Sequence, residues 1–226
     1  MNVWVTRDEP PDGPLGAALR RRGLSPILEP VITRRLHTDC ADELSRLGPD
    51  DWLVLTSAYA INAVALEPAR VPRVAVIGDE SRRAAETRSL RVELVSTRHD
   101  VADLFEQLRR RVPRGAVCYP RSSRAAPPPP WPGVAVDSPV MYETLPRSFD
   151  VSVLNRVDVI TVVSPSAVDA IHQRCPLNHI PQPFAAIGPA TSAALRVCGV
   201  HPSLMAVAPS FDSLADAIAA FRQTGS

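Results

Sequence analysis

The sequence predicts an α/β protein with two doubly wound parallel sheets, one for each copy of an internally duplicated plan. Short runs rich in valine and isoleucine alternate with helical segments along the chain, and strands that are apolar throughout are typical of parallel sheets covered on both faces. Similar segments also recur in the same order, which indicates duplication. The 226 residues are enough for two small domains.

The repeat is carried by segments that match in order and in near-constant spacing. The matched pairs are 51–64 (DWLVLTSAYAINAV) with 158–171 (DVITVVSPSAVDAI), 75–85 with 185–195, 99–104 with 212–217, 3–7 (VWVTR) with 117–121 (VCYPR), and 23–32 with 133–142. Each copy therefore reads as strand, turn and helix, repeated.

The strands are short apolar runs. We expect them at 2–6, 26–32, 52–56, 73–77, 92–95, 115–119, 134–137, 158–163, 184–187 and 204–208. The helices lie between them. We expect them at 13–22, 39–47, 58–66, 80–87, 101–111, 165–174, 190–198 and 212–223. Ser57 and Ser164 precede two of these helices as N-cap residues.

One segment departs from the repeated plan. Between Arg121 and Gly133 the expected helix is replaced by SSRAAPPPPWP, and four consecutive prolines cannot continue a helix. We interpret residues 127–130 as a surface connection of polyproline type. A motif for a proline-binding partner domain is the alternative.

Composition excludes several classes of function. All 25 basic residues are arginine, and the absence of lysine excludes a Schiff-base lysine, a pyridoxal-phosphate lysine and a P-loop lysine. A net charge of +1 gives no general attraction to nucleic acid. No apolar run is long enough for a membrane span, and the four cysteines form no CxxC pair. We expect a soluble cytoplasmic monomer with reduced thiols.

Polar or small residues follow several of the predicted strands. They are Arg7, Thr56, Ser57, Gly78, Ser96, Arg121, Ser164, Ser166, Gly188, Thr191 and Ser210. In open parallel sheets ligands bind beyond the carboxyl ends of the strands, and helix N-termini, hydroxyls and arginines there suit anions. The simpler interpretation is that Ser57 is only a helix cap and Gly188 only a turn.

Metal and nucleotide sites are not expected. His172, Cys175 and His179 have a faintly ligand-like spacing, but Pro176 interrupts the segment and no second pair completes a tetrahedral site. The chain has no Walker A, GxGxxG, GxSxG or HExxH motif. We therefore expect no cofactor and no metal.

Segments 5–32, 52–64 (WLVLTSAYAINAV), 162–171 (VVSPSAVDAI) and 185–200 (AAIGPATSAALRVCGV) resemble the uroporphyrinogen-III synthase family over nearly the whole chain. The resemblance implies a discontinuous first lobe of residues 1–33 and 147–226 and a second lobe of residues 39–140. Residues 34–38 and 141–146 would then be two paired linker strands.

The resemblance also implies the reaction. The substrate is hydroxymethylbilane, a linear tetrapyrrole with eight carboxylates, which loses water and closes with its last pyrrole ring inverted. No cofactor is implied, and catalysis would consist largely of positioning. The alternative from the residues alone is a non-catalytic, two-lobed anion-binding or regulatory module.

By the same resemblance, Tyr142 is the residue that helps the hydroxyl to leave. The turns that bind the substrate would contain Thr6 and Arg7, Thr56 and Ser57, Ser164 and Ser166, and Gly188 and Thr191. Arg121 is added to this binding set from its place at a predicted strand end, not from the resemblance. Two features depart from the family pattern: the acidic turn Gly78-Asp79-Glu80-Ser81 and the proline run at 127–130. Both lie in the second lobe, where we expect weaker substrate binding.

Overall fold

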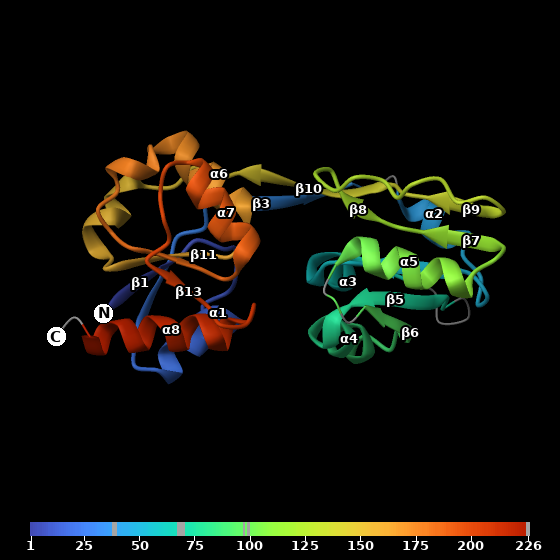
Figure 1. The fold of residues 1–226 in the computed structure, drawn as a ribbon, viewed down its shortest axis with the longest axis horizontal. Helices are drawn as coiled ribbons and strands as arrows, with labels where there is room; N and C mark the ends of the chain where they lie inside the picture. Colours follow the sequence, from blue (N-terminus) through green and yellow to red (C-terminus); the bar gives the residue numbers. More distant parts are fainter. Residues whose placement is uncertain (38–39, 67–70, 97, 99, 225–226) are drawn as a thin grey trace. The chain divides into compact units, whose positions relative to one another are not determined.

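The computed structural model describes residues 1–37, 40–66, 71–96, 98 and 100–224. The chain forms two compact units, residues 1–33 with 145–226 and residues 34–144 (Figure 1). Two residues that belong to predicted elements lie outside the described residues. They are residue 38, the last of the predicted linker strand 34–38, and residue 39, the first of the predicted helix 39–47 and of the predicted second lobe 39–140.

The first unit contains a five-stranded sheet in the order β13-β12-β11-β1-β2, with every neighbouring pair parallel. Its strands are β1 (Asn2–Val5), β2 (Ser25–Leu28), β11 (Val159–Val162), β12 (Phe184–Ala186) and β13 (Leu204–Met205). Its helices are α1 (Pro14–Arg21), α6 (Pro165–Arg174), α7 (Pro189–Val197) and α8 (Phe211–Thr224), with 3-10 turns η3 (Val151–Arg156) and η4 (Leu177–His179).

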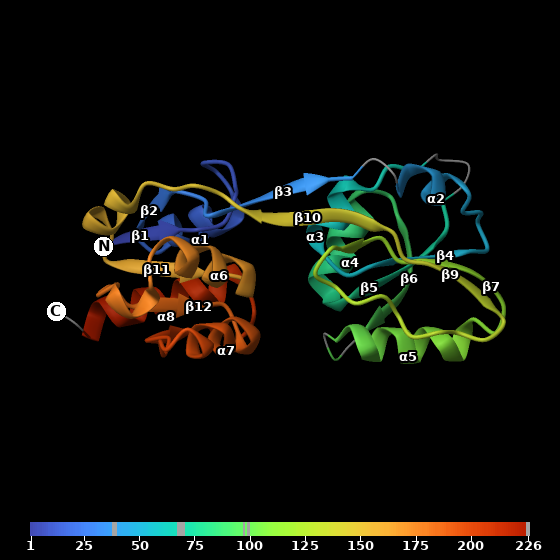
Figure 2. The ribbon, with the colours of Figure 1, turned by 90° about the horizontal axis from the view of Figure 1, so that it is seen from above.

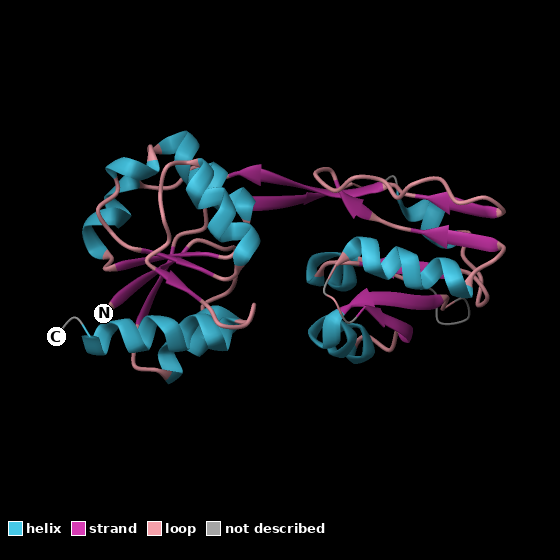
Figure 3. Cartoon of the chain, viewed as in Figure 1, coloured by secondary structure: helices cyan, strands magenta, loops and turns pink. Residues whose placement is uncertain are grey.

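Helices cover both faces of this sheet (Figure 3). Val3 and Val5 of β1 pack in the core that contains residues of α1 and α8, whereas Trp4 packs in the core that contains residues of α6 and α7. Successive residues of a strand point to opposite faces, so a strand buried on both sides must be apolar throughout. The predicted doubly wound fold is confirmed.

The second unit contains another five-stranded parallel sheet, in the order β6-β5-β4-β7-β9. Its strands are β4 (Trp52–Leu55), β5 (Arg73–Ile77), β6 (Arg91–Ser96), β7 (Gly115–Cys118) and β9 (Val134–Asp137). Its helices are α2 (Ala41–Ser45), α3 (Ala58–Ala63), α4 (Gly78–Thr87) and α5 (Val101–Arg111). Alternate residues of β4 again enter two cores, one with α3 and α4 and one with α5.

The two sheets have the same order of equivalent strands. The repeat pairs β1 with β7, β2 with β9, β11 with β4 and β12 with β5, and these strands take the same places in the two sheets. In the second unit all five strands lie in one continuous stretch of the chain, whereas in the first unit β1 and β2 precede the whole second unit. The duplication predicted from the sequence is confirmed.

A third sheet has the order β3-β10-β8. Its strands β3 and β10 carry the chain across the boundaries between the two units (Figure 2). Its strands are β3 (Ile32–Leu36), β8 (Arg121–Ser122) and β10 (Val140–Pro146). The His37 backbone N–H donates to the Met141 carbonyl, and the Arg147 N–H donates to the Val31 carbonyl, each at 2.8 Å. Residue 31 is thus opposite residue 147 and residue 37 is opposite residue 141. Because the partner number falls as the chain advances along β3, β3 and β10 are antiparallel.

Several element boundaries differ from the expectation, and two of these differences have a local cause in the sequence. The predicted strand 26–32 is two strands, since β2 ends at Leu28 and β3 begins at Ile32 in a different sheet. Pro30 lies between them and has no N–H to donate to a ladder. Helix α4 begins at Gly78, earlier than predicted, and a φ of 70° at this residue suits glycine.

The proline run forms neither helix nor strand, as predicted. Arg109 of α5 donates through Nη2 to the carbonyls of Pro129 and Pro130, at 3.0 and 3.1 Å. Its guanidinium also lies over the ring of Trp131, with 5.7 Å between Cζ and the ring centroid. The run is thus held against its own unit, which disfavours the alternative of an extended partner motif.

Candidate functional site

The phenol of Tyr142 meets the carboxyl end of β4 in the second unit. Its hydroxyl donates to Ser57 Oγ at 3.0 Å, and the same Oγ accepts the Ala60 backbone N–H at 3.1 Å. Ser57 is therefore both the cap of α3, as predicted, and the partner of Tyr142. The two residues come from β10 and from the β4–α3 turn, far apart in the sequence.

The rest of Tyr142 is buried. Only 8% of the residue is exposed, and its ring lies edge-on to Tyr59 with 4.8 Å between centroids. The Arg34 guanidinium lies over the other aromatic ring, 5.1 Å from the Tyr59 centroid. A buried ring with its hydroxyl at a polar strand end is a well-held hydrogen-bond donor.

Thr56, beside Ser57, lies 3.5 Å from the hydroxyl of Tyr119, measured between Oγ1 and Oη. Tyr119 is 1% exposed and stands edge-on to Phe105 at 5.2 Å between centroids. The sequence pattern marks Tyr119 only as the end of a strand, and it does not single out Tyr59 or Arg34. A tyrosine immediately after a buried strand is the signal that could have found Tyr119.

In the first unit, the predicted residues lie at the ends of the neighbouring strands β1, β11 and β12. Thr6 is fully buried, and its hydroxyl donates to the Thr161 carbonyl at 2.6 Å, so it joins β1 to β11. Arg7 pairs with Glu9 (Nε to Oε2, 3.3 Å) and lies over the Phe211 ring at 4.3 Å. Both side chains therefore have structural contacts of their own.

The turns into α6 and α7 resemble one another. Ser164 accepts the Ala167 N–H at 3.3 Å as the cap of α6, and Pro165 follows. Gly188 precedes α7, and Pro189 follows. Thr191 is only 3% exposed, whereas Ser166 is half-buried. Each turn thus offers the first backbone N–H groups of a helix, which have no partner within the helix.

Arg121 and the acidic turn complete the predicted residues of the second unit. Arg121 donates through Nη1 to the Ala125 carbonyl at 2.6 Å, which fixes the loop after β8. Asp79 lies in the first turn of α4 and pairs with Arg82 at 3.2 Å, so part of its charge is compensated.

The sequence model of uroporphyrinogen-III synthase HemD matches residues 14–216 of the chain. The chain belongs to the uroporphyrinogen-III synthase family. This confirms the predicted function, the cyclisation of hydroxymethylbilane to uroporphyrinogen III within porphyrin biosynthesis. Nothing in the comparisons favours a non-catalytic anion-binding module. No curated protein matches the chain.

Solved uroporphyrinogen-III synthases share the fold. A mutant of the enzyme from the extremely thermophilic bacterium Thermus thermophilus is 17% identical, with a TM-score of 0.56 and coverage of 99% of both chains. The enzyme from Helicobacter pylori is 13% identical, with a TM-score of 0.63 and coverage of 98% of this chain and 99% of the other. At these identities the likeness concerns the fold alone.

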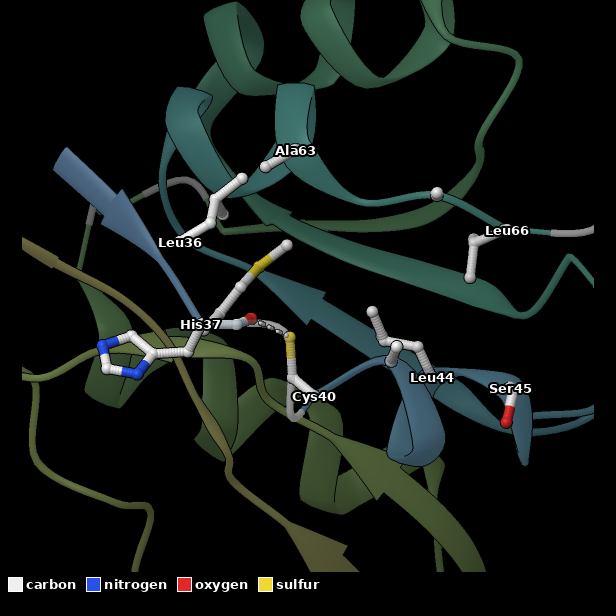
Figure 4. A pocket seen from close by; sticks show the side chains of 10 residues that line it. Leu36, His37, Cys40, Leu44, Ser45, Ala63 and Leu66 are labelled. Atoms are coloured by element: carbon white, nitrogen blue, oxygen red, sulfur yellow. Dashed lines mark hydrogen bonds between the residues drawn. The ribbon is translucent and has the colours of Figure 1, made fainter.

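Two cavities of the synthase's second unit have mostly apolar linings. One of about 690 Å³ is bordered by Leu36, Leu44, Leu66 and Met141, and Cys40 donates from Sγ to the His37 carbonyl at its edge. Figure 4 shows the His37 imidazole directed away from Leu44 and Leu66. The other, of about 500 Å³, lies between α5 and the proline run. Neither is bordered by Ser57 or Tyr142.

Metal ligands do not gather in the described part of the synthase. Among these residues, no three histidine, cysteine or acidic side chains lie together as a metal site would require. None of the described helices has the length and apolar character needed to cross a bilayer.

Proposed function

We propose that Tyr142 is the proton donor of this uroporphyrinogen-III synthase and that the polar strand ends of both units bind the substrate carboxylates. The contact between Tyr142 and Ser57 supports this assignment best. It holds a phenol in one position at the carboxyl end of a parallel strand, which is where such sheets bind ligands.

The first step breaks the carbon–oxygen bond of the terminal hydroxymethyl group. The electron pair leaves with oxygen, which takes the Tyr142 proton and departs as water. The pyrrole nitrogen stabilises the carbocation that remains. The α-carbon of the last ring that already carries the bridge to the third ring attacks this centre, and the new carbon–carbon bond gives a spiro intermediate. The bond from that α-carbon to the bridge carbon then breaks, its electron pair returns to the last ring, and the bridge carbon becomes a second carbocation. The free α-carbon of the last ring attacks it and loses its proton, which balances the one that Tyr142 gave and leaves the last ring inverted.

Anion binding is assigned to backbone groups as well as to side chains. The N–H groups of Ser166 and Thr191 lie in the first turns of α6 and α7, where the helix dipole favours carboxylates. Thr6 and Thr191 are buried. We therefore propose that Thr6 supports the binding site by fixing the end of β1 against β11, and that the Thr191 side chain shapes the first turn of α7. Arg7, Thr56, Ser57, Ser164, Gly188 and Arg121 complete the proposed binding set.

The proposal further specifies a hydro-lyase that works as a monomer without cofactor or metal. All four cysteines are free thiols, as is typical of a reducing compartment, and we place the enzyme in the cytoplasm on this ground.

Incubation with enzymatically generated hydroxymethylbilane, after exhaustive chelation and dialysis, tests the proposal. We expect the type III isomer to be the main product when types I and III are separated. Uncatalysed closure gives type I, so a product of type I alone would reject the activity. Activity that returns only when a metal or nucleotide is added would reject the cofactor-free mechanism.

A further inference from the structure

Two adjacent arginines of β3 have different surroundings. Arg35 donates through Nε to Glu143 Oε1 at 2.7 Å, and His37 Nε2 lies 3.4 Å from the same oxygen. Arg34 is exposed and forms no ion pair with another residue in the part of the chain that the structure describes. Because side chains alternate along a strand, Arg34 and Leu36 share the face opposite to Arg35 and His37.

The contact of Arg34 with Tyr59 leaves its hydrogen-bond donors available. A guanidinium that lies over an aromatic ring is held by cation–π attraction, which uses the ring face and none of the five N–H groups. Such an arginine is pre-oriented to grip a carboxylate with two parallel hydrogen bonds.

The position of this arginine relates it to the reaction. Tyr59 touches Tyr142 edge-on, and the Tyr142 hydroxyl is the proposed proton donor. Arg34 thus contacts Tyr59, and Tyr59 contacts Tyr142, whose hydroxyl would protonate the leaving group. The carboxylate of Glu143 is occupied by Arg35 on the other face of β3, so it does not compete for Arg34.

We propose that Arg34 and Tyr59 form a binding site for a carboxylate side chain of the pyrrole ring that reacts at Tyr142. This rests on the proposed role of Tyr142. Arg34 binds the acidic group while Tyr59 holds the guanidinium in place. Anchoring one side chain of the reacting ring fixes how that ring can turn, so Arg34 contributes to the choice of isomer as well as to affinity.

Substitution of the two neighbouring arginines tests the site. Because a hydrogen bond between charged groups is stronger than a neutral one, Arg34→Gln is expected to raise KM about 10- to 100-fold. The product should shift toward type I, and the salt dependence of KM should become shallower. Arg35→Gln is the matched control and should leave KM within about twofold, because Arg35 already has a carboxylate partner. Arg34→Lys should restore part of the affinity as a point charge.

The outcomes separate this proposal from the one on which it rests. Arg34→Gln with the KM and isomer ratio of wild type overturns the Arg34 site and leaves the synthase mechanism standing. An equal rise in KM for Arg34→Gln and Arg35→Gln also overturns it, since only the net charge would matter. A wild-type enzyme that forms no type III product overturns the proposed function itself.

Discussion

The Tyr142 hydroxyl and the Ser57 hydroxyl are 3.0 Å apart, and Ser57 at the same time caps α3 by accepting the Ala60 N–H. One serine therefore joins the proposed proton donor to a helix terminus. The position of the phenol depends on a helix cap, and the two roles of Ser57 can be separated by mutation.

Removal of the Tyr142 hydroxyl should slow catalysis without unfolding the protein. Tyr142→Phe keeps the buried ring and its edge contact with Tyr59. General acid help typically contributes about 10²- to 10⁴-fold, but water or a substrate carboxylate can replace part of it. We expect a turnover reduced several-fold or more, measured as kcat for type III product.

Tyr142→Ala separates chemistry from packing. Only 8% of the residue is exposed, and deletion of a buried aromatic side chain costs about 3 kcal/mol or more. The melting temperature should fall for the alanine variant and stay near wild type for phenylalanine. Wild-type turnover of Tyr142→Phe together with a destabilised Tyr142→Ala would make the residue purely structural.

Ser57→Ala should have two effects. Loss of the N-cap reduces the free energy of unfolding by about 1 kcal/mol, and Ser164→Ala, which removes a similar cap from α6, gives a matched value for stability. Turnover should also fall, because Tyr142 loses its hydroxyl partner. In a double-mutant cycle, Ser57→Ala should add little to the turnover defect of Tyr142→Phe. Independent, multiplying defects in kcat would contradict the coupling.

Ionic strength should act on affinity more than on turnover. Carboxylates bound by arginines and helix N-termini are attracted through solvent, and the Debye length is about 10 Å at 0.1 M salt. We expect KM to rise steeply between about 0.05 and 0.5 M salt while kcat changes little. A KM indifferent to salt would argue against an anion-binding site.

Cys118 should be unreactive in the native protein. Burial, together with nearby Asp137 and Glu43, raises the pKa of its thiol to about 12, so the thiolate that alkylating agents require is scarce at about pH 8. Mass spectrometry after iodoacetamide should show modified Cys118 only in denatured protein, whereas half-buried Cys175 reacts sooner. Equal labelling of Cys118 in native and denatured samples would refute this.

The link between α1 and α8 should weaken in acid. Arg22 binds Asp216 through Nε and Nη2 at 2.6 and 2.9 Å, and it reaches Asp212 at 3.0 Å. Hydrogen bonds from arginine lower the pKa of both carboxyl groups. Carboxyl groups with a lowered pKa stabilise the fold above their unfolded pKa of about 3.9, and this stability is lost as pH falls through the folded value.

Arg22→Gln should therefore flatten the fall of melting temperature between about pH 5 and pH 2. Arg20→Gln is the control, because Arg20 donates to the Pro11 carbonyl, which does not titrate. If the melting temperature falls equally steeply with acid in wild type and in Arg22→Gln, the contacts of Arg22 with Asp212 and Asp216 do not contribute to the acid sensitivity.

The sequence by itself determined the elements, their duplication and the family. Continuous apolar runs such as 52–55 report strands buried on both faces, and Ser57 and Ser164 mark helix starts because a cap acts on the backbone next to it. These signals are local, so they can be read without the fold. The duplication itself could also be read from the sequence, whereas the strand order that the two sheets share is seen only in the structure.

The tertiary structure alone decided which side chains meet. Thr6 and Thr56 are both hydroxylated residues after a strand. The Thr6 hydroxyl, however, donates its hydrogen bond to the Thr161 carbonyl inside the sheet. Arg34 and Arg35 are identical neighbours, yet one faces Tyr59 and the other Glu143. Such differences depend on partners distant in the chain, and strand order, register and the face of each strand bring those partners together.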